Sequence, residues 1–203
     1  MFLKKGESEL FFVHIPRSGG RYIRYLFKDL NGYDSWYGSS DKFYKGVEQM
    51  HLHLKLLKEL PEYKSSPKFT VVRNPVDRFI SMMTADFSLH NHLNKKLIVS
   101  DLKVFKIYLK DTPIYRAYFT NWFKPQYEFI GRDCKIWRYE DGFGKSFHDF
   151  LYKEFNIVLK VKKQKIIAAS KYDNNKTLKL KPEFIKEVKK FYRKDYALLG
   201  DYA

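Results

Sequence analysis

The stretch Glu9-Leu-Phe-Phe-Val-His-Ile-Pro-Arg-Ser-Gly-Gly20, with the residues that follow it, decides the fold of this 203-residue chain. Residues 9–15 are almost continuously apolar, which is typical of a strand buried on both faces. Pro16-Arg-Ser-Gly-Gly20 ends this strand. Apolar side chains then recur at helical spacing until Asn31-Gly32, namely Tyr22, Ile23, Leu26, Phe27 and Leu30. Residues 9–32 therefore predict a strand, a glycine-containing loop and a helix.

The same pattern returns further along the chain. Lys68-Phe-Thr-Val-Val-Arg73 predicts a second buried strand, and Pro75 suits the first turn of a following helix. We also predict a strand at 135–139 and helices at 52–60, 100–111, 147–155 and 182–191. Strands that alternate with helices predict an α/β fold with a central parallel sheet flanked by helices. Ligands bind beyond the carboxyl ends of such strands, so we expect the site at loops 16–20 and 73–75.

The first loop has the residues of an anion-binding site. Gly19 and Gly20 let backbone N–H groups face an anion, and the following helix start adds partial positive charge. Arg17 and Arg21 bring formal charge to the same place. The nucleotide triphosphate motif Gly-x4-Gly-Lys-[Ser/Thr] is absent. The alternative interpretation is a plain strand–helix turn with two exposed arginines.

The second loop carries Arg73 at a strand end and Ser81 about two helical turns further on. If the loop curls over, a guanidinium and a hydroxyl could grip one phosphate. The alternative pairs Arg73 with Asp77 as an ion pair at the helix start. Further along, the carboxylates of Arg138-Tyr-Glu-Asp141 are interpreted as caps of the next helix.

The segment His51-Leu-His53 offers a proton acceptor for a hydroxyl group, because neutral imidazole is available near physiological pH. Residues two apart cannot share a helix face, so only one of the pair is expected to act as the base. No third ligand is spaced for a metal site, and we predict none. His90 and His92 repeat the spacing, so a structural role for the first pair remains an alternative.

Composition limits the class of protein. The chain has 39 Lys and Arg against 23 Asp and Glu, a net charge of +16, and a single cysteine, Cys134. A disulfide-stapled scaffold is therefore excluded. No stretch approaches the roughly 18 apolar residues of a membrane span. The first nine residues lack a secretory signal pattern, so we expect a cytoplasmic protein. No linker divides the chain, and we expect one domain over residues 1–203.

Together these segments resemble the carbohydrate sulfotransferases (sulfotransferase family 2), and in particular their uronyl 2-O-sulfotransferase branch. His14-Ile-Pro-Arg-Ser-Gly-Gly20 is similar to the family's 5′-phosphosulfate loop, His-Ile-Pro-Lys-Thr-Gly-Gly. Val72-Arg-Asn-Pro-Val-Asp-Arg-Phe-Ile-Ser81 is similar to its 3′-phosphate motif, and His51-Leu-His53 to its histidine segment. Later segments that resemble the family are Pro125–Ile130, Trp137–Asp141 and Tyr192–Gly200.

The resemblance implies a P-loop-kinase-like three-layer fold and 3′-phosphoadenosine 5′-phosphosulfate (PAPS) as sulfuryl donor. The product would be adenosine 3′,5′-bisphosphate, and the acceptor a carbohydrate hydroxyl. The basic segment 155–203 could steer an anionic polysaccharide acceptor, and the alternative interpretation is a solvated helix face. His51 or His53 would be the base and Arg17 would stabilise the leaving phosphate. The donor-binding positions would be Arg17, Ser18, Gly19, Gly20, Arg21, Tyr22, Arg73 and Ser81.

The chain departs from the family pattern at the loop. Arg17 replaces a lysine, and Arg21 and Tyr22 replace small hydroxyl residues. Arginine is larger and planar, so the first exchange is not conservative. A homologue that binds PAPS without turnover is therefore one alternative, and a nucleotide kinase on the same fold is another. A nucleic-acid-binding module leaves both loop motifs unexplained, and no nucleic-acid partner is expected. The resemblance also suggests a bacterial or viral source.

Overall fold

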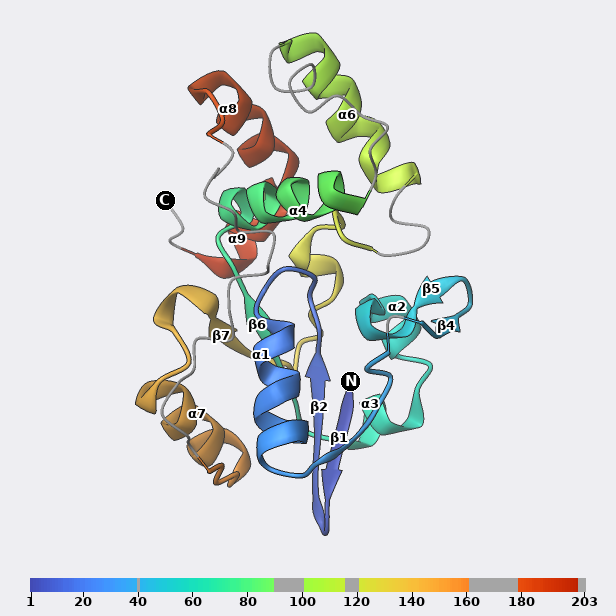
Figure 1. The fold of residues 1–203 in the computed structure, drawn as a ribbon, viewed down its shortest axis with the longest axis vertical. Coiled ribbons are helices and arrows are strands. Elements are labelled where there is room, and N and C mark those ends of the chain that lie inside the picture. Colours follow the sequence, from blue (N-terminus) through green and yellow to red (C-terminus); the bar gives the residue numbers. More distant parts are fainter. Residues whose placement is uncertain (40, 90–100, 116–120, 161–178, 201–203) are drawn as a thin grey trace.

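The computed structural model describes residues 1–39, 41–89, 101–115, 121–160 and 179–200 (Figure 1). In these ranges a central sheet has the strand order β3-β1-β2-β6-β7, and β4 and β5 form a separate pair. The strands are β1 (Phe2–Lys5), β2 (Ser8–Val13), β3 (Asp34–Trp36), β4 (Phe43–Tyr44), β5 (Val47–Glu48), β6 (Lys68–Val72) and β7 (Lys135–Arg138).

The three strands expected from the sequence lie together and run parallel. Phe12 on β2 pairs with Phe69 on β6, and Thr70 on β6 pairs with Ile136 on β7. This arrangement confirms the α/β fold class. Two antiparallel strands, β1 and β3, extend the sheet beyond β2. Neither was predicted, because β1 buries only its first two residues and β3 has only three residues of mostly exposed character.

The predicted helices are present with adjusted bounds. The helix at 52–60 is broken into shorter pieces, whereas those after Gly20, Asn74, Asp101, Gly144 and Lys181 are continuous. The helical elements are α1 (Gly20–Arg24) with its π-helical continuation η1 (Tyr25–Leu30), η2 (Gln49–His51), α2 (Leu54–Leu57), α3 (Pro61–Ser65), α4 (Pro75–Leu89), α6 (Leu102–Tyr115), η3 (Gln126–Glu128), η4 (Tyr139–Asp141), α7 (Lys145–Phe155), α8 (Pro182–Phe191) and α9 (Arg193–Leu199).

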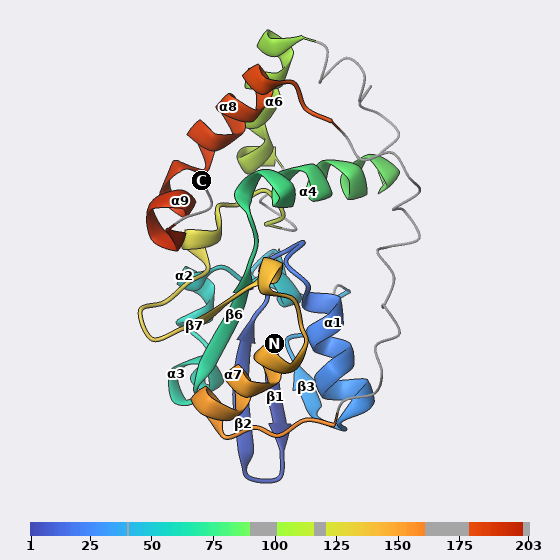
Figure 2. The same ribbon diagram turned by 90° about the vertical axis from the view of Figure 1, so that its left-hand side faces the viewer.

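Helices cover both faces of the sheet, as a three-layer fold requires (Figures 1 and 2). Along β2, Leu10 and Phe12 pack with residues of α1, η1 and α7. Phe11 and Val13 point to the opposite face and pack with residues of α2 and α3. The alternation follows from the period of two in a strand, and it explains why residues 9–15 are apolar throughout.

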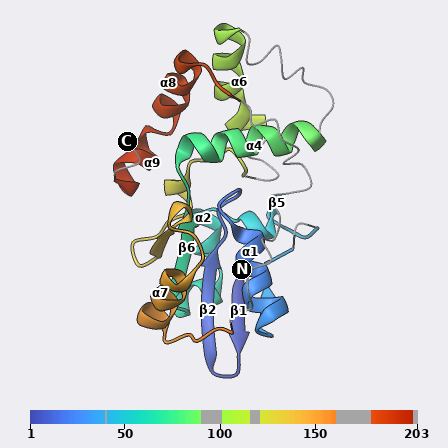
Figure 3. The same ribbon diagram turned by 60° about the vertical axis from the view of Figure 1, so that its left-hand side comes forward.

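A third hydrophobic cluster lies beyond the carboxyl ends of the parallel strands (Figure 3). There α4 crosses the top of the sheet and packs against α8, which in turn packs against α6. The rings of Phe79, Phe105 and Phe184 meet edge to face at centroid distances of 5.9 and 4.8 Å. Because α4 starts directly after β6, the same helix belongs to this cluster and to the loop region where a ligand is expected.

Candidate active site

The loop between β2 and α1 turns sharply over the end of the sheet. Arg17 has φ +65° and Gly19 has φ +88°, so two of its residues are left-handed. The carbonyl of Gly19 accepts the first helical hydrogen bonds, from Tyr22 N at 2.9 Å and Ile23 N at 3.2 Å. Gly19 is needed here, because a Cβ atom at this position would lie 2.7 Å from the ring of Phe143.

Three predicted site residues from both loops meet beside this turn. Arg17 Nε donates a hydrogen bond to Ser81 Oγ at 3.0 Å, and Arg73 Nη1 donates to the carbonyl of Arg17 at 3.3 Å. Arg73 ends the β6 segment and Ser81 lies on α4, so 64 residues of chain separate Ser81 from Arg17. The structure therefore brings together two guanidinium groups and a hydroxyl, the residue types that bind phosphate oxygens.

Ser18 adds an uncommitted polar group to the same loop. Its side chain is 1 % exposed, and its hydroxyl makes no hydrogen bond to any residue that the structure describes. Buried hydroxyl groups are normally paired, because leaving one unsatisfied costs about 1–3 kcal/mol. An orphaned hydroxyl beside Arg17 fits an anionic group such as a sulfate or phosphate.

Arg73 is held in place by Gln126 and Tyr139, which are not among the site residues predicted from the sequence. Its backbone N–H donates to Gln126 Oε1 at 3.0 Å, and its carbonyl accepts from Gln126 Nε2 at 2.8 Å. Its guanidinium carbon lies 4.6 Å from the centre of the Tyr139 ring. Within the described chain no salt bridge joins Arg73 to Asp77, so the ion-pair alternative is wrong.

Asp195 supports this arrangement from α9. Its two carboxylate oxygens accept hydrogen bonds from Gln126 N and Tyr127 N, both at 2.9 Å. The side chain is fully buried. Asp195 therefore supports Arg73 through Gln126. The segment Tyr192–Gly200 thus has a structural role at the site.

We expect Asp195→Ala to destabilise the protein by about 2 kcal/mol, because two buried backbone N–H groups lose their acceptor. Urea denaturation measures this change. Asp149→Ala serves as the control, because Asp149 is an exposed carboxylate paired with Lys145 one helical turn away. That pair should contribute no more than about 0.5 kcal/mol. Equal losses in the two variants would contradict the proposed bracing role.

Arg78 is a second buried support for the loop. Its Nε donates to the carbonyl of Pro16 at 3.0 Å, and one terminal nitrogen donates to the carbonyls of Trp122 and Lys124 at 2.8 and 2.9 Å. The guanidinium also faces the ring of Tyr192 at 5.9 Å. Arg78 thus ties α4 to the loop between β2 and α1.

The start of α4 differs in detail from expectation. Asn74 caps it, because Asn74 Oδ1 accepts from the N–H groups of Val76 at 2.9 Å and Asp77 at 3.3 Å. The N–H of Asn74 donates to Glu140 Oε1 at 2.7 Å. The expected capping of the next helix by 140–141 is wrong, since Gly144 is the N-cap of α7 and no side chain caps it.

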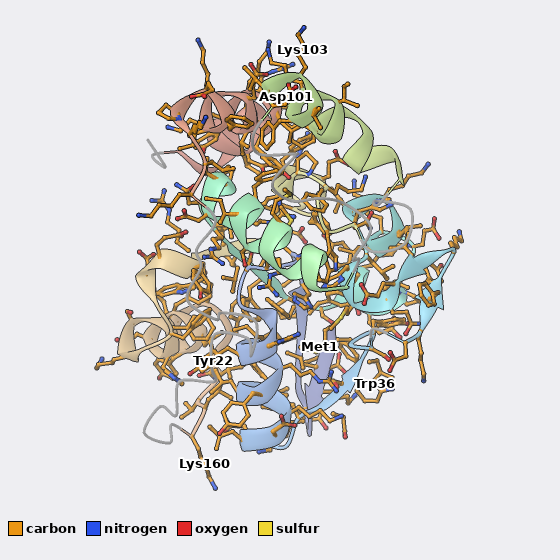
Figure 4. All side chains as sticks on the ribbon, turned by 45° about the horizontal axis from the view of Figure 1, so that its top comes forward. Met1, Tyr22, Trp36, Asp101, Lys103 and Lys160 are labelled. Carbon is orange, nitrogen blue, oxygen red and sulfur yellow. The ribbon has the colours of Figure 1, made fainter. Side chains whose placement is uncertain are left out.

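Three aromatic rings border the turn. Tyr22 projects from α1 toward the segment before α7 (Figure 4), where its ring centroid lies 4.7 Å from that of Phe143. Tyr139 packs edge-on against Phe143 at 5.8 Å. Tyr22 is one of the predicted site residues, whereas Tyr139 and Phe143 are not. Flat apolar faces beside two arginines suit a nucleobase attached to a phosphate.

The two histidines of His51-Leu-His53 lie in different surroundings. His51 is buried, and its ring centroid lies 4.7 Å from that of His14 at the end of β2. His14 in turn borders Gly20, at which a Cβ atom would overlap the His14 ring. His53 begins α2 and is partly exposed. His51 is therefore the one connected through packed groups to the loop between β2 and α1.

Burial controls the protonation of these histidines. It lowers the pKa of His51 to about 3, and the nearby Arg78 guanidinium acts in the same direction. The pKa of His53 is lowered too, by burial and then by Lys124. His51 Nε2 makes no hydrogen bond within the described part of the chain. A neutral imidazole with an uncommitted nitrogen can accept a proton.

Some expectations fall outside the described residues. His90 and His92 do, as does much of the basic segment 155–203. In the ranges that are described, no helix is both long and apolar enough to span a membrane. The same ranges hold no group of three or more His, Cys, Asp and Glu residues that could bind a metal ion.

Comparison with known proteins gives one match. The model described as "Sulfotransferase family" matches residues 1–118. This segment contains both loops predicted to bind an anion, His51 and His53, and more than half of the 203 residues. No curated protein and no solved structure matches the chain.

Proposed function

The chain belongs to the sulfotransferase family, and we propose that it transfers a sulfuryl group from PAPS to a carbohydrate hydroxyl. The observation that supports this most is the meeting of Arg17, Ser81 and Arg73 beside the loop after β2. When bound, PAPS would supply the sulfuryl group that is transferred, and the phosphate of adenosine 3′,5′-bisphosphate would be the leaving group. The orphaned Ser18 hydroxyl and the left-handed turn at Gly19 fit such an anion.

Each residue of the donor site has a role that its position supports. Arg17 neutralises charge that develops on the departing phosphate, helped by backbone N–H groups of residues 18–21. Arg73 and Ser81 bind the 3′-phosphate, which distinguishes this donor from ATP. The rings of Tyr139 and Phe143 offer a face to the base. Because Gln126 and Asp195 hold Arg73 in place, little rearrangement is needed on binding.

His51 is the proposed general base, in preference to His53. It takes the proton of the acceptor hydroxyl through Nε2. His51 packs against His14, which borders the anion-binding loop, and its low pKa keeps it unprotonated at neutral pH. His53 has Lys124, Glu128, Lys55 and Glu59 as charged neighbours. Lys124 and Glu128 form an ion pair with each other at 3.0 Å, so His53 lies beside a separate charged group.

The acceptor is proposed to be a carbohydrate, with an anionic polysaccharide as the favoured class. The support is the net charge of +16 and the exposed lysines of α8, among them Lys186, Lys189 and Lys190. A cationic surface attracts an anionic polymer over about 8–10 Å at physiological salt. Acceptor affinity should therefore fall steeply as salt is raised.

The proposed donor site predicts a thermal shift with adenosine 3′,5′-bisphosphate. At 100 times its dissociation constant, a ligand stabilises the folded state by about 2.7 kcal/mol. For a chain of this length the expected rise in Tm is roughly 5–10 °C. The shift should not depend on Mg²⁺ and should be lost in Arg73→Ala. AMP, which lacks the 3′-phosphate, is the control ligand.

Other outcomes separate the alternatives. No shift with the bisphosphate, together with a larger one from ATP and Mg²⁺, would overturn the donor assignment and favour a nucleotide kinase. A shift without sulfuryl transfer to any carbohydrate acceptor would support a binding-only homologue. A specific observation keeps that alternative open, because the Arg17 guanidinium already donates to Ser81. If the Arg17→Lys variant gained turnover, this result would support the binding-only homologue.

A further inference from the structure

A buried carboxylate holds one side of the His51 ring. Glu48 ends β5, three residues before His51, and its Oε2 atom lies 2.5 Å from His51 Nδ1. The side chains of the pair are only 11 % and 6 % exposed. No sequence motif pointed to Glu48. Because Nδ1 is occupied by this contact, Nε2 is the nitrogen left to meet a substrate.

The ring has little freedom to turn away from Glu48. On one side lies His14 at a centroid distance of 4.7 Å, and on another the indole of Trp122 meets it edge-on at 6.4 Å. The backbone is fixed as well, because Asn121 Nδ2 donates to the His51 carbonyl at 2.9 Å. A histidine held this way keeps whichever tautomer its carboxylate partner selects.

We propose that Glu48 is a positioning residue for His51, an inference that rests on the proposed function. The Glu48 carboxylate accepts the hydrogen bond from the Nδ1 proton of His51, and so leaves Nε2 free as the base. The acceptor hydroxyl then gives its proton to Nε2 while its oxygen forms the new bond to sulfur. The bond from sulfur to the donor's phosphate oxygen breaks, and the electron pair leaves with the phosphate. The ionised Glu48 carboxylate stabilises the imidazolium that results.

The same contact can exist with the proton on the carboxylate. A protonated Glu48 would donate to Nδ1, the ring proton would then lie on Nε2, and His51 could not act as a base. Burial, reinforced by Asp41, raises the pKa of Glu48 to about 7, whereas burial lowers the pKa of His51 to about 3. Glu48 is ionised above its own pKa, so turnover should rise with pH through about 7.

Other charged groups also face the pair. Arg78 on α4 and the amino group of Met1, just before β1, both lower the pKa of His51. The ring of His14, just after β2, lies 4.7 Å from that of His51. Glu48 is the group in contact with Nδ1. Glu48 is therefore the group whose ionisation sets the tautomer.

Nitrogen NMR of the histidine side chains tests the tautomer directly, without any substrate. The His51 signals are assigned by their loss in His51→Asn. At pH 8 we expect a protonated Nδ1 and an unprotonated Nε2, changing below about pH 7 in the wild type. In Glu48→Gln this change should disappear. A proton on Nε2 at pH 8, or identical spectra in the two proteins, would overturn the proposal.

Kinetics test the consequence for turnover. Glu48→Gln should lower kcat at least about 10-fold while the acceptor KM and bisphosphate affinity stay within about 2-fold, and the rise near pH 7 should vanish. The matched control is Glu59→Gln, a carboxylate that pairs with Lys45 and Tyr44 away from His51. A purely structural Glu48 would lower Tm and leave the pH profile of kcat intact, which would contradict the proposal.

Failure of the donor assignment remains distinguishable from failure of this inference. A wild-type protein that does not bind the bisphosphate would refute the sulfotransferase mechanism. The NMR experiment would still show whether Glu48 sets the tautomer of His51. Conversely, a wild type that binds the bisphosphate and turns over, with an Nε2-protonated His51 at pH 8, would refute the role of Glu48 and the assignment of His51 as the base, and would leave the donor assignment intact.

Discussion

His51→Ala is expected to lower kcat for sulfuryl transfer by about 10²–10⁴-fold, the range that one general base supplies. The reason is positional as well as chemical. His51 is the histidine whose ring packs on His14 beside the loop after β2, and its Nε2 has no partner in the described chain. The measurement is single-turnover sulfation of a carbohydrate acceptor with saturating PAPS, at pH 8.

The matched control for this variant is His53→Ala. It should change kcat by no more than a few-fold, because His53 lies at the start of α2 near Lys124 and Glu128. Bisphosphate affinity should be unchanged in both variants, since neither ring is hydrogen-bonded to Arg17, Arg73 or Ser81 in the described part of the chain. A larger loss in His53→Ala would reverse the assignment of the base.

Gly20→Ala is expected to have the largest effect on the fold of the site. A Cβ atom at this position would overlap the imidazole of His14. That ring has no easy escape, because it is stacked on Phe12 at 5.5 Å and lies against His51. Forcing an atom into such a space costs about 3 kcal/mol, which corresponds to roughly 6–12 °C in Tm for a chain of this size.

Gly144→Ala is the control for this substitution. Gly144 has ordinary backbone angles, and an added Cβ would meet nothing within 4 Å. We expect it to change stability by about 0.5 kcal/mol. The double variant His14→Ala with Gly20→Ala should lose less than the sum of the single losses, since removing the ring makes room for the methyl group. Strict additivity would show that the clash is not the cause.

The sequence predicted the parts of the fold that depend on local pattern. The strands at β2 and β6 are buried on both faces, so their apolar runs are recognisable without a structure. The helices that follow them begin at Gly20 and Pro75, which are ordinary start signals. The family resemblance, carried by the two loops after these strands, is confirmed by the match over residues 1–118.

Long-range pairings could not be predicted in this way. The hydrogen bond between Arg73 and Gln126 joins residues 53 apart in the chain, and the one between Gln126 and Asp195 joins residues 69 apart. Nothing in the local pattern distinguishes a buried Asp195 from the exposed charges around it. Likewise Glu48 lies in a segment without clear periodicity, and only its approach to His51 shows what it contacts. The roles of the individual site residues stay predictions until the binding and kinetic experiments are made.

The left-handed conformation of Arg17 shows a trade-off at the donor loop. Such a conformation costs a residue with a Cβ atom roughly 1–2 kcal/mol relative to the right-handed region. Glycine would adopt it freely but would remove the guanidinium that reaches Ser81. The chain thus accepts a less stable backbone at a position whose guanidinium we propose faces the donor's phosphate. Substitutions that raise the thermal stability of this protein should therefore be made at positions other than 17, because a glycine there would relieve the backbone strain and remove the positive charge together.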